Sequence, residues 1–211
     1  MKTVVYVDAF NLYYGSLKGS DLKWLDLNKL MPLILPKHQV IQIRYFTAQI
    51  TPKKYDRTAP LRQKAYLDAL ETLPNVSIHY GRYQTKEARM PLAYPIAGQP
   101  KIVVVLKTEE KGSDVNLATH LLVDAHAQLA DHFVVISNDA DLAEPIRVVR
   151  HDLNLNVGII NPHAPKERSW ALSNVNPTFH WDLRKGVLRA SQFPSSISAG
   201  GKTIRKPTEW A

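Results

Sequence analysis

Residues 3–11 read TVVYVDAFN, a run of mostly β-branched apolar residues that stops at an acid. Such residues favour strands, and about four to eight apolar residues is the usual length of a strand buried on both faces. We therefore expect residues 3–7 to form a buried strand, with Asp8 at its carboxyl end. The run is much shorter than a secretory signal core or a bilayer span, so we expect no targeting or membrane segment here.

Strand-like and helix-like patterns then alternate along the chain. Strands are predicted over residues 40–47, 76–83, 102–106, 132–137 and 156–160. Helices are predicted over residues 25–35, 61–73, 114–130 and 142–150, and residues 84–100, which contain three prolines, are expected to be irregular. Strands that alternate with helices over most of a chain indicate a parallel sheet covered by helices on both faces.

The helix over residues 114–130 has the clearest pattern. Gly112 and Ser113 supply a break and an N-cap in front of it. Apolar residues recur at spacings of three and four, at Val115, Ala118, Leu122, Ala125 and Leu129. We expect these residues to form the buried face, with Asp114 at its rim and pointing inward or along the sheet edge.

Composition narrows the class of protein. The 211 residues, 45% of them apolar, are enough for one domain with a sizeable core. No Cys is present, which excludes disulfides, thiol nucleophiles and Cys-ligated zinc and fits a reducing, cytoplasmic location. Lys and Arg exceed Asp and Glu by 27 to 19, so the net charge of +8 favours a polyanionic partner, nucleic acid first. The chain has no P-loop, dinucleotide or nucleophile-elbow motif, which leaves those three enzyme classes without support.

Four acids fall at the ends of predicted buried elements. Asp8 follows the first strand, Asp114 opens the long helix, and Asp139 and Asp141 follow the strand that ends at Ser137. Ligands of open parallel sheets bind beyond the carboxyl ends of the strands, so Asp8 and Asp139 meet there if their strands are neighbours. Carboxylates gathered in this way repel one another unless a cation lies between them, and Mg²⁺ or Mn²⁺ prefers such oxygen ligands.

Each acid also has a purely structural alternative. Asp8 can cap a turn, Asp114 can interact favourably with the helix dipole, and Asp141 with Glu144 fits a capping box. The polar neighbours of the acids favour the functional interpretation. These neighbours are Asn11 after Asp8, Lys111 and Gly112 before Asp114, and Ser137 and Asn138 before Asp139.

Three short motifs carry a family resemblance. They read Val7-Asp8-Ala9-Phe10-Asn11-Leu12, Lys111-Gly112-Ser113-Asp114-Val115 and Ser137-Asn138-Asp139-Ala140-Asp141-Leu142, in this order along the chain. Over residues 3–161 the sequence resembles the NYN domains of the PIN-like nuclease superfamily, particularly the bacterial LabA-like group. The resemblance implies a Rossmann-like, three-layer α/β/α fold with a mostly parallel sheet. It also implies an acid cluster that binds Mg²⁺ or Mn²⁺ and hydrolyses RNA.

The resemblance also implies a role for each motif residue. The implied metal ligands are Asp8, Asp114 and Asp139, and Asp141 is the implied fourth catalytic acid, with Glu109 and Glu110 as competitors for that place. The residues expected to position a carboxylate, the loop or a phosphate are Asn11, Lys111, Ser137 and Asn138. The family often has Gly in place of Ala9 and of Asn138 and an aromatic residue in place of Leu142, but none of these departures removes a carboxylate.

Residues 51–101 carry more than half of the net charge. Nine Lys and Arg stand against four acids in this segment, and five Tyr are interleaved with them. Positive charge combined with aromatic stacking planes suits single-stranded RNA, and a solvated helix face with a Pro-rich loop is the alternative. The residues expected to contact RNA are Lys53, Lys54, Arg57, Arg62, Arg82, Lys86 and Arg89.

We therefore expect one nuclease domain over residues 1–185 and a basic, flexible tail over residues 186–211. The predicted activity is metal-dependent hydrolysis of RNA, and the alternative is a non-catalytic, regulatory RNA-binding module that keeps the pocket. A metal-dependent phosphatase is a weaker alternative, because Phe10 replaces the second Asp that such enzymes carry two residues after the first. We expect a cytoplasmic protein without a membrane segment, and the sequence leaves a homodimer open.

Overall fold

The computed structural model describes residues 1–52, 56–95, 98 and 100–210, and its centre is a six-stranded sheet. The strands are β1 (Lys2–Asp8), β2 (Gln39–Thr47), β3 (Val76–Tyr80), β6 (His132–Ile136), β7 (Asn156–Asn161) and β8 (Phe179–Asp182). Their order across the sheet is β3-β2-β1-β6-β7-β8, and every neighbouring pair is parallel. The predicted Rossmann-like, three-layer α/β/α fold is confirmed.

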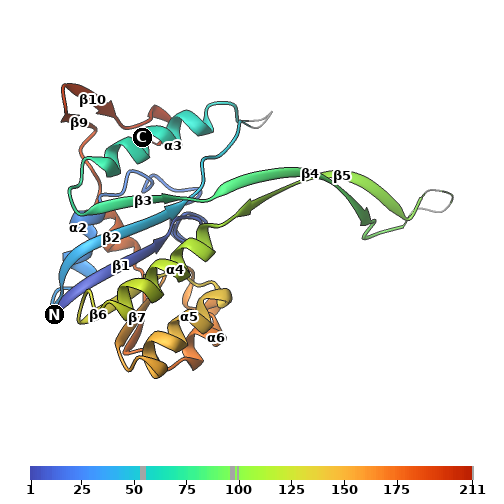
Figure 1. Ribbon diagram of the computed structural model, residues 1–211. Helices are drawn as coiled ribbons and strands as arrows, with labels where there is room; N and C mark the ends of the chain where they lie inside the picture. Colours follow the sequence, from blue (N-terminus) through green and yellow to red (C-terminus); the bar gives the residue numbers. More distant parts are fainter. Residues whose placement is uncertain (53–55, 96–97, 99, 211) are drawn as a thin grey trace.

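Alternate residues of β1 point into two separate cores, as the period of two of a strand requires. Val5 and Val7 pack into one core, and Val4 and Tyr6 into the other. Helices α2 (Leu27–Ile34) and α3 (Ala59–Glu71) cover the first core, whereas α4 (Ser113–His126), α5 (Ala143–Arg147) and α6 (Trp170–Asn174) cover the second (Figure 1). Shorter turns connect them: α1 (Ala9–Leu12), the π-helical turns Tyr13–Leu17 and Val148–Asp152, and the 3-10 turns Ala140–Leu142 and Pro165–Glu167.

Helix α4 buries only part of the predicted face: Ala125 is buried, and Ala118 and Leu122 pack against the second core, but the centre of the buried face is shifted. Leu117 and Leu121 are fully buried, whereas the side chain of Val115 is 68% exposed. Asp124 lies on the buried face, where it accepts hydrogen bonds from Arg44 of β2 at 2.7 and 2.9 Å. The spacing of apolar residues did not reveal this face, because it includes a charged residue, Asp124, whose burial depends on the bidentate partner Arg44 in strand β2.

The prediction of an irregular segment over residues 84–100 was wrong for residues 84–91, which belong to a strand, whereas residues 92–95 lie outside any helix or strand. Strand β4 (Arg82–Pro91) pairs antiparallel with β5 (Ile102–Lys111) along their whole length, from Arg82 opposite Lys111 to Pro91 opposite Ile102. The two strands form an arm that extends away from the body of the molecule (Figure 1). The predicted strand over residues 102–106 therefore exists, but it belongs to this β4–β5 arm and not to the parallel sheet. Sequence patterns miss such pairing because the partner strand, not the local composition, supplies the hydrogen bonds.

The segment predicted to be a flexible tail instead folds against the domain. It forms α7 (Lys185–Ala190), the hairpin of β9 (Ser196–Ala199) and β10 (Lys202–Arg205), and the 3-10 turn Thr208–Trp210. The indole of Trp24 donates a hydrogen bond to the carbonyl of Pro194 at 2.8 Å, and the ring of Trp210 lies 6.3 Å from the rings of both Trp24 and Tyr66. The average composition of this segment is polar, but a few large apolar residues such as Trp210 pack it against the domain. No helix in the described part of the chain is both long and apolar enough to cross a bilayer.

Candidate active site

The neighbouring strands β1 and β6 form the centre of the candidate site. Val7 of β1 lies opposite Ile136 of β6, so the residues that follow both strands meet at the carboxyl edge of the sheet. The strand order reverses direction here, because β2 and β3 lie on one side of β1 and the later strands lie on the other. Such a switch point leaves a crevice in which open parallel sheets bind their ligands.

Three carboxylates converge at this edge of the sheet. One oxygen from each of Asp8, Asp114 and Asp139 lies within 4.8 Å of the other two. We call these three residues the acid cluster. Asp8 is almost fully buried, and the other two are half-buried. The sequence predicted this convergence on condition that β1 and β6 were neighbours, and that condition is met.

Asp8 is held in place by three hydrogen bonds. Its Oδ1 accepts the backbone N–H of Asn11 at 2.9 Å, and its Oδ2 accepts the Asn11 amide at 2.9 Å and the Ser137 hydroxyl at 2.8 Å. Burial raises the pKa of Asp8, whereas the hydrogen bonds from Asn11 and Ser137 oppose the rise. Asp8 is thus both the N-cap of α1 and a member of the acid cluster, so the structural and functional interpretations of this residue hold together.

Asp114 lies in the first turn of α4, immediately after the arm. Gly112 has a φ of +100°, a left-handed conformation that favours glycine, and it turns the chain from β5 into the helix. Glu110 accepts hydrogen bonds from the backbone N–H of Ser113 at 3.1 Å and from its hydroxyl at 2.7 Å, which caps the helix. Burial, followed by the negative charges of Asp8 and Asp139, raises the pKa of Asp114 to about 6.

Asp139 is likewise both a member of the acid cluster and the N-cap of the 3-10 turn Ala140–Leu142. Its Oδ1 accepts the backbone N–H of Asp141 at 3.0 Å, and its own N–H donates to the Ser137 hydroxyl at 3.0 Å. Ser137 therefore links Asp139 to Asp8. Asp141 itself is exposed and lies outside the group of carboxylates that can share one ion among the described residues.

The competing candidates for a fourth acid are engaged elsewhere. Glu109 forms ion pairs with Lys107 at 2.5 Å and with Lys111 at 3.3 Å, and Glu110 caps α4. Glu110 and Asp141 are both close enough for their charges to contribute to the raised pKa of Asp114, so the role of Asp141 as an assisting acid stays a prediction. Lys111, predicted to contact a phosphate, is exposed and rests on Glu109 in the free protein.

A histidine joins the edge of the site without having been predicted. The Nε2 atom of His163 lies 3.1 Å from the Oδ1 of Asn11, which also accepts the backbone N–H of Asn138 at 3.1 Å. The Asn138 amide in turn bonds the carbonyl of Glu167 at 2.8 Å. The sequence held a signal for His163, because Asn161-Pro162-His163 follows β7 just as the acids follow β1 and β6.

The predicted RNA-contacting residues fall into separate groups. Arg82, Lys86 and Arg89 are exposed on the arm. Arg57 is exposed on the body, but Arg62 is mostly buried in ion pairs with Asp56 and Glu209 and is poorly placed to bind RNA. Lys53 and Lys54 lie outside the described residues. The pairing register puts Arg82 and Lys86 on one face of the arm with Lys107 and Lys111. Glu109 lies on the same face and pairs with both lysines, so four basic side chains face one acid near the acid cluster.

The acid cluster fits a hard divalent cation. All its donors are carboxylate oxygens, the ligands that Mg²⁺ and Mn²⁺ prefer. Among the ion pairs of the described residues, none involves Asp8, Asp114 or Asp139. No lysine or arginine therefore neutralises the three charges, which leaves their mutual repulsion to be relieved by protons or by a cation.

Comparisons with known proteins agree with this fold. The NYN domain family model matches residues 2–183. The chain is 30% identical to 6-hydroxy-3-succinoylpyridine 3-monooxygenase HspA of Pseudomonas putida (strain DSM 28022 / S16), over 100% of this chain and 75% of that protein. It also resembles the crystal structure of a protein of unknown function from Vibrio parahaemolyticus RIMD 2210633, with a TM-score of 0.56 and 15% identity, over 87% of this chain and 93% of the other.

Proposed function

Because the chain belongs to the NYN domain family, we propose that it is a metal-dependent nuclease that hydrolyses phosphodiester bonds of RNA at the acid cluster. The observation that carries this proposal is the convergence of Asp8, Asp114 and Asp139 at one edge of the sheet without a basic partner. A structural acid normally has a cation beside it, as Asp124 has Arg44. Three carboxylates whose oxygens lie within 4.8 Å of one another, with no lysine or arginine paired to them among the described residues, are better explained by a cation site.

The residues of the cluster supply binding and orientation. Mg²⁺ or Mn²⁺ held there supplies Lewis-acid chemistry to a phosphate oxygen and to an attacking water. Asn11 and Ser137 fix the carboxylate of Asp8 through both of its oxygens, so this ligand is oriented before substrate binds. Asp114, whose pKa is about 6, gives up its proton near neutral pH, so cation binding is tighter above that pH.

The basic face of the arm supports RNA as the substrate. Arg82, Lys86, Lys107 and Lys111 lie on this face, and Lys111 is three residues from Asp114. Lys and Arg side chains in such a row bind phosphates of any sequence. Tyr83, on the opposite face, packs edge-on against Phe10 at 6.1 Å and fixes the root of the arm beside α1. A single strand lying on the arm would thus reach the acid cluster.

The proposal is tested by cleavage of an end-labelled single-stranded RNA oligomer, with MnCl₂ and with EDTA. We expect cleavage that requires the metal and falls by more than about 100-fold in Asp139→Asn, since each ~1.4 kcal/mol of lost transition-state stabilisation is a factor of ten. Asp21→Asn, which changes an exposed acid outside the acid cluster, is the matched control and should keep full activity. An Asp139→Asn protein that cuts as fast as the wild type refutes the assignment.

Three further readouts separate the alternatives. Salt-sensitive RNA binding without turnover at any divalent metal would support the non-catalytic module. Release of phosphate from mononucleotides faster than cleavage of oligomers would support a phosphatase. The related monooxygenase is named for an oxidation of 6-hydroxy-3-succinoylpyridine, so this compound is the third test substrate. Its hydroxylation by the present protein, without RNA cleavage, would overturn the nuclease proposal.

A further inference from the structure

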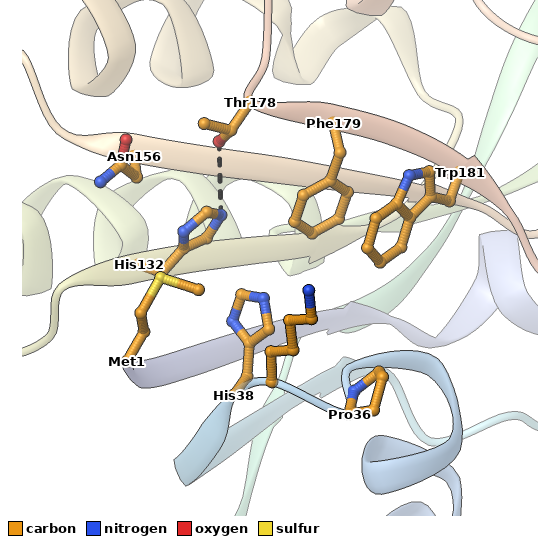
Figure 2. Close-up of a pocket in the computed structure, with 9 residues that line it drawn as sticks. Met1, Pro36, His38, His132, Asn156, Thr178, Phe179 and Trp181 are labelled. Atoms are coloured by element: carbon orange, nitrogen blue, oxygen red, sulfur yellow. Dashed lines mark hydrogen bonds between the residues drawn. The ribbon is translucent and has the colours of Figure 1, made fainter.

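A second cavity lies at the opposite edge of the sheet from the acid cluster. Its volume is about 410 Å³, within the usual range for small-molecule sites, and its lining residues include Lys37, His38, His132, Phe179 and Trp181. We call it the amino-edge pocket because β6, β7 and β8 begin there (Figure 2). Strand β1 runs between the two sites, so they are separated by roughly 20 Å, the length of seven strand residues.

The side chain of His132, which lines the pocket, has a buried nitrogen that no hydrogen-bond donor reaches. The hydroxyl of Thr178 donates its proton to the carbonyl of Val157 at 2.6 Å, so the 3.3 Å bond between His132 Nε2 and Thr178 Oγ1 uses the proton of the imidazole (Figure 2). Burial lowers the pKa of His132 to about 4, which keeps the ring neutral at pH 7. Nδ1 is then a bare lone pair, and it is buried without a hydrogen-bond partner. Such atoms are rare in folded proteins because leaving them unpaired is costly.

Flat rings line one side of the pocket. The ring of Phe179 stacks on His132 at 5.5 Å and on Trp181 at 4.0 Å, and His38 meets His132 edge-on at 4.9 Å (Figure 2). Trp181 is nevertheless 46% exposed and lines the cavity, so part of its aromatic surface is open to a ligand. Aromatic faces of this kind favour a planar ligand that stacks or meets them edge-on.

The charge of the pocket favours an anion. Lys37 is part of the lining, and none of the described lining residues is acidic. Arg150 is also near enough for its positive charge to contribute to the lowered pKa of His132. A negatively charged group on the ligand would therefore meet cations and no competing carboxylate.

We propose that the amino-edge pocket binds a planar nitrogen heterocycle that carries an N–H or O–H donor and an anionic group. The donor satisfies Nδ1 of His132, the ring lies across the edges of the stacked Phe179 and Trp181 rings, and the anion lies by Lys37. Two kinds of molecule share this chemistry: heteroaromatic carboxylates such as 6-hydroxynicotinate, and pyrimidine mononucleotides such as UMP. The pocket is separate from the acid cluster, so this proposal stands or fails independently of the nuclease proposal.

The test measures binding by calorimetry and the His132 ring nitrogens by NMR, on the full chain with any affinity tag at its carboxyl end. We expect 6-hydroxynicotinate to bind and to shift the Nδ1 resonance of His132. Nicotinate, which keeps the anion but lacks the donor, should bind about tenfold more weakly, as one hydrogen bond to a buried group implies. Tighter binding of UMP than of 6-hydroxynicotinate assigns the pocket to nucleotides, and the reverse assigns it to carboxylates.

Two surface variants test the assigned contacts. Lys37→Gln should weaken 6-hydroxynicotinate about threefold to tenfold but leave uncharged 2-hydroxypyridine unchanged. Trp181→Ala should weaken both ligands about tenfold, whereas Trp170→Ala, which removes a 78% exposed indole outside the pocket, is the matched control and should change neither.

The outcomes that overturn the proposal are equally defined. One is the absence of any His132 shift with both 6-hydroxynicotinate and UMP at millimolar concentration. Another is unchanged binding in both Lys37→Gln and Trp181→Ala. Loss of binding in EDTA or in Asp139→Asn would place the ligand at the acid cluster, and this result too would overturn it. Retained binding in Asp139→Asn, even where RNA cleavage fails in every form of the protein, supports the pocket.

Discussion

Replacing Asp114 by Asn should make the metal-free protein more stable, an unusual result for a residue in a functional site. The pKa of Asp114 rises from 3.8 to about 6 on folding, so the folded protein holds this proton more tightly than the unfolded chain does. Stability from this group is therefore complete below about pH 4 and is lost as the pH rises to about 6. Above that pH the charged carboxylate opposes folding, and a neutral amide removes the opposition.

The size of the effect follows from the same pKa. A rise of this size corresponds to about 3 kcal/mol at ~1.4 kcal/mol per pH unit. Asp114 is only half-buried, and solvent screens its repulsion from Asp8 and Asp139, so roughly 1–1.5 kcal/mol is a better expectation. For a domain of this length that gain raises the Tm by about 3–5 °C.

The assay is thermal unfolding in EDTA at pH 4 and pH 8, and again at pH 8 with MnCl₂. Asp114→Asn should exceed the wild type in Tm at pH 8 in EDTA and match it at pH 4. With a saturating metal at about 100 times its Kd, the wild type should gain about 2.7 kcal/mol and the variant much less, which reverses their order. Asp21→Asn should follow the wild type throughout. An Asp114→Asn Tm equal to or below the wild type in EDTA at pH 8 would refute the reasoning that burial and the neighbouring carboxylates make the charged form of Asp114 unfavourable.

Three other changes have defined outcomes. Asp124→Ala leaves the buried guanidinium of Arg44 unpaired and should lower the free energy of unfolding by about 3–5 kcal/mol in urea denaturation, whereas removing an exposed acid such as Asp21 should not. Gly81→Ala places a methyl group 2.8 Å from the carbonyl oxygen of Lys111, so it should cost about 1–3 kcal/mol and slow RNA cleavage in the same assay used for Asp139→Asn. Trp210→Ala removes the ring packed on Trp24 and should free the C-terminal segment, which limited proteolysis would detect as earlier cleavage after residue 190.

The strands and helices that form the layers of the fold could be predicted because their hydrophobic patterns lie within short windows of the sequence. A buried strand such as β1 is a short apolar run, and an amphipathic helix repeats every three to four residues, so both are visible in any window of the sequence. The β4–β5 arm was not visible in this way. Its strands obtain their hydrogen bonds from each other, and residues such as Val104 and Leu106 are 62% and 75% exposed although a run of apolar residues normally indicates burial.

The acid cluster could be predicted from the sequence except for one point, the order of the strands in the sheet. The motifs placed Asp8 and Asp139 after strands, but only the sheet order shows that these strands are neighbours. His163 was missed because its contact with Asn11, 152 residues away, is not visible in the sequence. Arg62 was included among RNA contacts because positive charge is visible in a sequence, whereas its ion pair with Glu209, 147 residues away, is not.

The place where the arm joins the body has a mechanical consequence. Gly81 and Gly112 lie against each other there, and a Cβ on Gly112 would be 3.8 Å from the Cα of Gly81. The arm is about 30 Å long, estimated from its ten paired residues, and these two glycines lie at its base. Asp114 lies two residues after Gly112. A rotation of the arm about these glycines would therefore also move Asp114 relative to Asp8 and Asp139, the other two members of the acid cluster.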